Sequence, residues 1–232
     1  MQAVYDLSRY PANFNFIEFL SAAKAYGATH IRFDDSKGYK SKFSPEITKG
    51  RVNNILIPAC ALAGMTYDFG PGKGIDPGYK LPVVFKAYQE TGTIGRLVSV
   101  LPRGTAKYTV TIRDYDRYPD RNSDRNAWEK FAKEVGAVVI DEYYKKPISL
   151  HERMALYAGA DMNYFVGNGP ASLCLFSHYP FVMFMKTNYD ELQLQGVPFG
   201  GQVPWMVARQ HFVWEQDNYY QISKAHKAYG VR

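Results

Sequence analysis

The sequence predicts an α/β protein made of two lobes, each a parallel sheet flanked by helices. Strand-like and helix-like segments alternate at short intervals after Lys107, residues 2–35 follow a strand, helix, strand pattern, and a junction with Pro102 and Gly104 separates the two regions. Such alternation is typical of parallel strands joined by right-handed crossovers. We therefore expect lobes at 1–104 and 105–232, with ligands bound at the carboxyl ends of strands in a cleft between them.

The C-terminal lobe carries the clearest pattern. Strands are predicted at KYTVTIR (107–113), AVVIDEY (137–143), DMNYFVG (161–167) and PFVMFMK (180–186), the second of them buried on both faces. Helices are predicted at SDRNAWEKFAKEVG (123–136), LHERMALYAGA (150–160), GPASLCLFSHY (169–179) and DNYYQISKAHKAYG (217–230). Their expected capping or first residues are Ser123, Ser149, Pro170 and Asp217.

The N-terminal lobe is less regular. Strands are predicted at QAVYDL (2–7), THIRFDD (29–35) and MTYDFG (65–70), with a helix at FNFIEFLSAAKAYGA (14–28). The segment 44–64 predicts a helix interrupted near Pro58. PGKGIDPGYK (71–80) predicts a loop, LPVVFKAYQETG (81–92) fits a strand or a helix, and RLVSVLP (96–102) predicts a strand.

Composition is that of a globular chain. Hydrophobic residues make up 46% and charged residues 22% of the 232 residues, and no window reaches the ~20 apolar residues of a membrane span. MQAVYDLSRY lacks the features of a secretory signal, so a cytoplasmic location is expected. The net charge of +6 favours an anionic partner, but the basic residues are dispersed, so DNA is only one alternative. Cys60 and Cys174 lie in apolar stretches and are expected to be buried thiols.

The first candidate site is the loop TIRDYDRYPDRNS. It places Arg113, Arg117 and Arg121 directly before Asn122 and a predicted helix N-terminus at Ser123. Guanidinium groups bind phosphate oxygens bidentately, and a helix N-terminus adds unpaired N–H groups. The loop therefore predicts a diphosphate site. The alternative is a solvated loop whose arginines balance the neighbouring aspartates.

The second candidate site is VGNGPASLC, another strand end that turns into a helix. Gly167 and Gly169 permit close approach of the backbone, and Ser172 adds a hydroxyl. The segment lacks GxGxxG and GxxxxGK[ST] spacing, which disfavours a nicotinamide enzyme or an ATPase. The alternative is a tight turn that needs glycine.

Together these segments resemble the sequences of a known protein family. Residues 108–186, with TIRDYDRYPDRNS, SLHERMALYAGAD and FVGNGPASLCLFSHYPFVMF, resemble the donor-binding half of glycosyltransferases of the GT-B architecture, which has two Rossmann-like lobes. The layout is similar to bacterial heptosyltransferases and, more distantly, to fucosyltransferases, and RQHFVWEQDNYYQI resembles the end of such enzymes. The N-terminal lobe is shorter than is usual in that family.

The resemblance implies a nucleotide-sugar donor bound by the C-terminal lobe, which would make the N-terminal lobe the acceptor side. Arg113 is the implied catalytic contact to the diphosphate. The implied donor-binding residues are Arg121, Asn122, Ser123, Asn168, Gly169, Pro170, Ala171 and Ser172. The last helix of the chain is a candidate to pack back on the N-terminal lobe.

Such an enzyme neutralises a departing diphosphate with cations and dipoles, which requires no metal or other cofactor. Asp6 is the expected general base, with Ser8 and Arg9 beside it on the acceptor side; a turn-forming aspartate is the alternative reading of Asp6. Asp34 and Asp35 form a second candidate pair, and no HExxH-like spacing predicts a metal. The expected function is glycosyl transfer to a hydroxyl of a glycan, a small molecule or modified DNA. The alternative is a non-catalytic module that binds a nucleotide sugar or nucleic acid.

Overall fold

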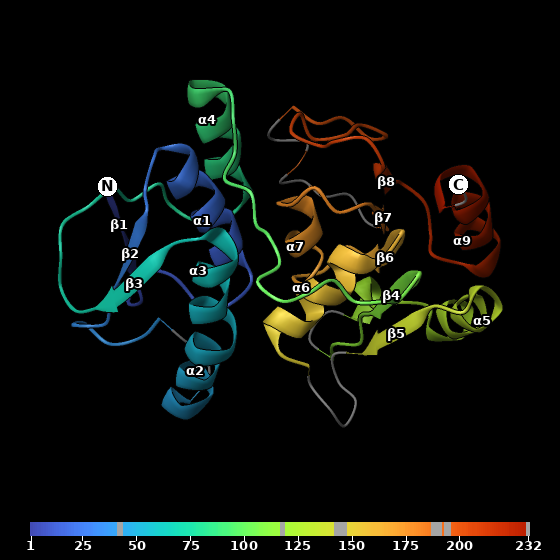
Figure 1. Cartoon of the computed structure of the whole chain (residues 1–232), viewed down its shortest axis with the longest axis horizontal. Helices are drawn as coiled ribbons and strands as arrows, with labels where there is room; N and C mark the ends of the chain where they lie inside the picture. The colour runs from blue at the N-terminus through green and yellow to red at the C-terminus, as the bar shows by residue number, and fades with distance from the viewer. Residues whose placement is uncertain (41–43, 117–118, 142–147, 187–191, 193–195, 231–232) are drawn as a thin grey trace. The chain divides into compact units, whose positions relative to one another are not determined.

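The computed structural model describes residues 1–40, 44–116, 119–141, 148–186, 192 and 196–230. They form two compact units, Met1–Val100 and Leu101–Arg232. Each unit is a Rossmann-like parallel sheet with helices packed on it, which confirms the predicted fold class (Figure 1). Within these described ranges, no helix combines the length and the apolarity needed to cross a membrane.

The first unit has a three-stranded sheet of order β1-β2-β3. Its strands are β1 (Gln2–Asp6), β2 (His30–Asp34) and β3 (Thr66–Phe69). Its helices are α1 (Asn15–Ala25), α2 (Pro45–Arg51), η1 (Val52–Leu56), α3 (Ile57–Ala63) and α4 (Leu81–Thr91). Alternate residues of β1 and β2 are buried, and the ring of Tyr5 in β1 meets Phe16 at 4.7 Å and Phe19 at 4.9 Å in α1, both edge-on.

One prediction for this unit is confirmed and another needs correction. The helical segment from Pro45 to Ala63 is interrupted near Pro58, as predicted, because the π-helical turn η1 separates α2 from α3 and Pro58 lies in the first turn of α3. Residues 96–102 form no strand, because the backbone of this region bonds to helices instead: Gly95 N–H donates to Ser21 O at 2.9 Å and Val98 N–H to Leu62 O at 2.9 Å. The ambiguous segment 81–92 is the helix α4.

The second unit has a five-stranded sheet of order β5-β4-β6-β7-β8. Its strands are β4 (Tyr108–Ile112), β5 (Val138–Asp141), β6 (Met162–Val166), β7 (Phe181–Phe184) and β8 (Gln210–Val213). Its helices are η2 (Pro119–Arg121), α5 (Arg125–Val135), α6 (Leu150–Gly159), α7 (Ser172–Leu175), α9 (Tyr219–Ala225) and η3 (His226–Gly230). Every residue of β4, β6 and β7 is buried. Ser149 caps α6 as predicted, in a capping box with Glu152.

The helices of this unit cover both faces of its sheet. Trp128 of α5 contacts Tyr164 of β6, whereas Tyr157 of α6 contacts the next residue, Phe165, which points to the opposite face. Helix α9 packs on α5, with the Lys130 ammonium 3.9 Å from the centre of the Tyr219 ring. Helices α5 and α9 therefore share one face, and α6 and α7 lie on the other (Figure 1).

Two predictions about the β4–β5 region are wrong. Strand β5 is not buried on both faces, because it is the edge of the sheet, and Val138 and Val139 remain 41% and 42% exposed. The N-cap of α5 is Asp124, which accepts a hydrogen bond from Ala127 N–H at 3.1 Å, and not Ser123. The Ser123 hydroxyl is already engaged as the acceptor of Arg113 N–H.

Strand β8 was not expected. It lies inside the phrase RQHFVWEQ, and its first residue, Gln210, is buried although polar. The Gln210 amide satisfies the burial by donating to the carbonyls of Cys174, Ser177 and Tyr179. The expected cap Asp217 is also wrong, because Asn218 caps α9.

The outer edge of β8 is closed by a side chain. Phe212 N–H donates to Gln202 Oε1 at 2.9 Å, and Gln202 Nε2 donates to the Phe212 carbonyl at 3.2 Å. One amide group thus pairs with both backbone groups of an edge residue, as a neighbouring strand would.

Candidate functional site

The sheet of the second unit has a switch point between its two central strands. After β4 the chain turns to α5 on one face, and after the adjacent strand β6 it turns to α7 on the other. In open α/β sheets, ligands bind outside the carboxyl ends of strands at such a point. Both loops singled out from the sequence begin here.

The arginine loop after β4 is closed by hydrogen bonds between its two ends. Arg113 N–H donates to Ser123 Oγ, and Ser123 N–H donates to the Arg113 carbonyl, each at 2.8 Å. The guanidinium of Arg113 lies 5.7 Å from the centre of the Tyr115 ring. Arg117 lies outside the described residues. The two ends of the loop are therefore fixed to each other, which holds the backbone of Arg113 in place.

Asn122 stabilises the same loop. Its Oδ1 accepts a hydrogen bond from Tyr115 N–H at 2.9 Å, and its Nδ2 donates to the Tyr115 carbonyl at 3.3 Å. The side chains of Asn122 and Ser123, expected to bind the donor, are thus engaged with the loop backbone. Their role in this geometry is to hold Arg113 and Arg121.

The glycine turn after β6 lies against the arginine loop. Arg121 Nη2 donates to the Gly167 carbonyl at 3.5 Å, so the structure brings the two predicted loops together. The helix predicted from Pro170 begins instead at Ser172 and has four residues. Because it is so short, its dipole adds little to anion binding.

Most backbone groups of the turn are already paired. Ala171 N–H donates to Asn168 Oδ1 at 2.9 Å, and both the N–H and the hydroxyl of Ser172 donate to the Gly169 carbonyl. The expected cradle of free amides at Ala171 and Ser172 is therefore absent from this turn. The amide nitrogen Nδ2 of Asn168 differs, because it is buried and has no hydrogen-bond partner among the described residues.

A third strand end contributes a cation that was not among the residues predicted from the sequence. Lys186 follows β7, donates to the Asn122 carbonyl, and pairs with Asp217 Oδ1 at 2.7 Å. The side chains of Lys186 and Asp217 are only 12% and 2% exposed. Lys186 ends the predicted strand PFVMFMK, so the strand-end rule applied to Arg113 would have found it.

Another arginine of this region is neutralised. Arg125 bonds to Asp114 at 3.1 Å, Glu129 at 3.1 Å and Asp141 at 2.8 Å. The hydrogen bond to Asp141 raises the pKa of Arg125 above its ordinary value. Asp114 of the arginine loop is therefore balanced by Arg125, which was not one of the three arginines considered from the sequence.

The residues expected on the acceptor side lie in the first unit, in one turn after β1. Asp6 Oδ1 accepts hydrogen bonds from Ser8 N–H at 2.9 Å and Ser8 Oγ at 2.6 Å, which is the turn geometry named as the alternative for Asp6. Arg9 forms an exposed ion pair with Asp76 at 2.9 Å. Tyr10 donates to the same carboxylate, and burial together with this hydrogen bond raises the pKa of Tyr10 to about 12.

Asp34 repeats this arrangement on the next strand. It is the register partner of Asp6, and its Oδ1 accepts from the N–H and hydroxyl of Ser36. These hydrogen bonds hold the pKa of Asp34 below its usual value. Two carboxylates therefore end neighbouring strands at the same edge of this sheet.

In the part of the chain that the structure describes, no three His, Cys, Asp or Glu side chains are grouped to hold a metal ion. Cys60 and Cys174 are buried free thiols, and burial raises the pKa of both. Comparisons with protein-family models and with curated proteins gave no match. A functional assignment therefore depends on the chemistry of the strand ends between β4 and β7.

Proposed function

We propose that this chain is a nucleotide-sugar-dependent glycosyltransferase whose donor diphosphate binds at the carboxyl edge between β4 and β6. The observation that carries the proposal is the Arg121 to Gly167 contact of 3.5 Å, which joins an arginine loop to a glycine turn at the switch point of the sheet. Binding at such a point is the general behaviour of α/β sheets. The similarity of these two segments to GT-B donor-binding halves supports the same function.

Each group at this edge has a distinct proposed role. Arg113 and Arg121 provide guanidinium groups for bidentate contact with phosphate oxygens. Lys186 adds positive charge, although Asp217 offsets part of it. The Asn168 Nδ2 group supplies a neutral donor whose hydrogen-bonding capacity is not used within the described residues.

The proposed reaction is a displacement at the anomeric carbon of the donor sugar. The bond between this carbon and the diphosphate oxygen breaks, a bond to the acceptor hydroxyl oxygen forms, and a base takes the hydroxyl proton. Positioned cations stabilise the departing diphosphate, so the proposal includes no metal or other cofactor. Asp6 is the proposed base, with Ser8 and Arg9 beside it. The proposed acceptor is a glycan, a small molecule or modified DNA. The proposed location of the enzyme is the cytoplasm.

Release of nucleoside diphosphate from a panel of nucleotide sugars tests this function. With the best donor and a mixture of acceptors, Arg113→Ala should reduce the rate on the order of 100- to 1000-fold, because one charge-directed contact to the leaving group is lost. Arg113→Lys should recover only part of the rate, since lysine lacks the bidentate fork. Arg103→Ala is the matched control, because Arg103 is exposed and lies outside the proposed site.

Melting curves of all variants exclude unfolding as the cause of a lost rate. An Arg113→Ala variant that folds and turns over within about threefold of the parent would remove Arg113 from the mechanism. Binding of a nucleoside diphosphate without turnover of any donor would instead identify a non-catalytic binding module.

A further inference from the structure

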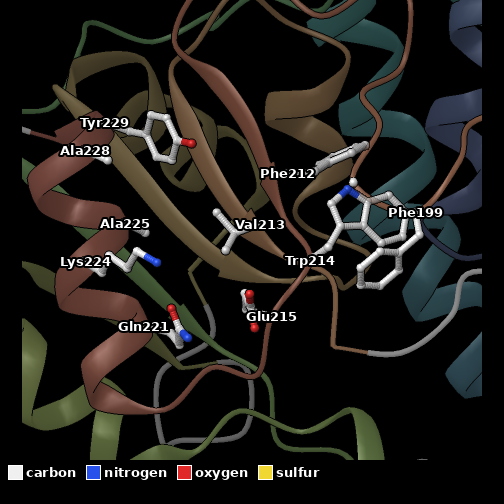
Figure 2. A pocket seen from close by; sticks show the side chains of 11 residues that line it. Phe199, Phe212, Val213, Trp214, Glu215, Gln221, Lys224, Ala225, Ala228 and Tyr229 are labelled. Carbon is white, nitrogen blue, oxygen red and sulfur yellow. The ribbon is translucent and has the colours of Figure 1, made fainter.

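A second candidate site lies at β8 and α9, apart from the arginine loop and the glycine turn. It is a hollow of about 340 Å³, within the lower part of the range of ligand pockets. Its walls come from three segments of the second unit. Figure 2 shows Phe199, Phe212 and Trp214 on one side and Gln221, Lys224 and Tyr229 on the helical side. The lining residues are Phe199, Gly200, Phe212, Val213, Trp214, Glu215, Gln221, Lys224, Ala225, Ala228 and Tyr229.

The aromatic side of the hollow is built on Trp214. Its indole N–H donates to the Gly201 carbonyl at 2.9 Å, which fixes the ring. Phe199 lies 5.3 Å from Trp214 between ring centres, at an interplanar angle of 54°, and is 64% exposed. Phe199 and Trp214 therefore give this side of the hollow an apolar aromatic surface.

The polar side of the hollow offers both donors and acceptors. Gln221 and Lys224 are one helical turn apart, so they lie on the same face of α9, and Glu215 lies between them and Trp214 in Figure 2. Among the described residues, no hydrogen bond or ion pair occupies the Glu215 carboxylate or the Lys224 ammonium. An ammonium, a carboxylate and an amide are therefore available to a ligand.

We propose that this hollow binds a neutral pyranose ring of a saccharide. A pyranose has an apolar C–H face that packs on aromatic rings and a rim of hydroxyl groups that both donate and accept hydrogen bonds. Glu215 disfavours a phosphate-bearing ligand, and its charge offsets that of Lys224, so the hollow suits an uncharged polar molecule.

The geometry favours a sugar over a nucleobase. A flat base is held best between parallel rings, but Phe199 and Trp214 are tilted relative to each other. Another ring of the lining, Tyr229, already has one face stacked on His211, at 4.1 Å between ring centres and an interplanar angle of 18°. The inference does not depend on the proposed function, because the acceptor side proposed above lies at Asp6 in the first unit and the test of this hollow requires no transfer.

The test is ligand-observed NMR on the full chain without a nucleotide donor. The probes are the methyl α- and β-pyranosides of glucose, galactose, mannose and N-acetylglucosamine, with adenosine and uridine as base probes and sorbitol as an acyclic control. We expect at least one pyranoside to bind in the millimolar range, a weak affinity for a single ring. Phe199→Ala should weaken this binding about tenfold, and Lys224→Gln should weaken it to a smaller extent.

Tyr220→Ala is the matched control, because Tyr220 is a 71% exposed ring on α9 that does not line the hollow. It should bind the pyranoside as the parent does. Lack of binding by every pyranoside at ~20 mM, a concentration that would detect millimolar affinity, would overturn the proposal. Unchanged binding by Phe199→Ala, or binding of adenosine or uridine in preference to any pyranoside, would also overturn it.

The outcome is distinguishable from that of the proposed function. Pyranoside binding that depends on Phe199, in a chain that releases no diphosphate, would retain the saccharide site and remove the transferase. Diphosphate release without any such binding would do the reverse.

Discussion

The indole N–H of Trp128 donates a hydrogen bond of 2.8 Å to the Asp217 carboxylate, 89 positions later in the chain. The same oxygen accepts from Asp124 N–H at 2.8 Å, and the other oxygen pairs with Lys186. One buried carboxylate therefore fixes the start of α5 to the cation that follows β7. Because Lys186 also contacts the Asn122 carbonyl, this network supports the arginine loop.

Replacing Asp217 should destabilise the second unit strongly. Asp217→Asn removes the negative partner of a buried ammonium and should cost about 3–5 kcal/mol, the usual penalty for leaving one member of a buried pair. Glu129→Gln is the control. The Glu129 side chain is 52% exposed, so its ion pair with Arg125 should contribute at most about 0.5 kcal/mol. Urea unfolding followed by tryptophan fluorescence measures both changes, and a loss below about 1 kcal/mol for Asp217→Asn would contradict the role assigned to the pair.

A change at Asn168 should weaken diphosphate binding without disturbing the glycine turn. Asn168→Asp keeps the Oδ1 acceptor of Ala171 N–H but replaces the buried Nδ2 donor by a negatively charged oxygen. The affinity for UDP, GDP or ADP, whichever binds the parent best in calorimetry, should fall at least tenfold, equal to about 1.4 kcal/mol. Asn126→Asp adds the same charge at an exposed position of α5 and serves as the control. Equal affinities of the two variants would place the diphosphate elsewhere.

Gly159 should tolerate no side chain. A Cβ at this position would lie 1.9 Å from the Gly104 carbonyl oxygen, a backbone atom that cannot move independently. Gly159→Ala should therefore destabilise the second unit by about 1–3 kcal/mol, as overpacking does. At Gly50 of α2 the added Cβ would meet nothing within 4 Å, so Gly50→Ala should stabilise its helix by about 0.5–1 kcal/mol. Calorimetric scans should show a lower melting temperature for Gly159→Ala and a higher one for Gly50→Ala. An unchanged melting temperature of Gly159→Ala would show that the backbone at Gly104 can move to accept the added Cβ.

The second unit should lose stability below neutral pH through His226. Burial lowers the pKa of His226 below its ordinary value of 6.5; Glu134 raises this pKa and Lys107 lowers it, each less than burial does. The ring also bonds to the Tyr164 hydroxyl and packs on Tyr108. Below pH 6.5 the unfolded chain therefore binds a proton that the folded chain accepts less readily, so stability falls as the pH falls from 6.5 towards the folded pKa.

Melting temperatures from pH 8 to pH 5 measure this effect. The His226→Gln variant cannot take up the proton. Its melting temperature, expressed relative to its own value at pH 8, should therefore fall less than that of the parent as the pH is lowered. Burial also lowers the pKa of His211, so part of the decline should remain in the single variant. A parent and a variant with the same decline would remove His226 as a source of the pH dependence.

The central strands of the second unit could be predicted because their sequences carry a local signal. KYTVTIR, DMNYFVG and PFVMFMK are β-branched or continuously apolar, as strands buried on both faces are. AVVIDEY has the same appearance, yet β5 is an edge strand, because an apolar run does not record how many neighbours a strand has. Strand β8 was not predicted, because its first residue, Gln210, is polar. The burial of Gln210 depends on hydrogen bonds to three carbonyls 31 to 36 positions away, which the local sequence does not show.

The candidate site was predictable only in part. Strand ends identified Arg113, Arg121 and the glycine turn, because the position of a loop at a sheet edge follows from element order. The pairing of the Ala171 and Ser172 amides inside the turn could not be inferred, because it depends on how Asn168 orients its side chain. Asp217 has the sequence context of a helix cap, and only its contacts with Trp128 and Lys186 show a different role.

A ribosome-bound or truncated chain that lacks β8 would expose the edge of β7. Strand β7 consists of four buried apolar residues, Phe181–Phe184, and β8 supplies the hydrogen bonds along its outer side. A chain that stops before residue 210 would leave this apolar strand as an unpaired edge, which is a template for association with other chains. During synthesis the same edge remains open until residues 210–213 have emerged, so holding chaperones should bind nascent chains that end before this strand in preference to longer ones.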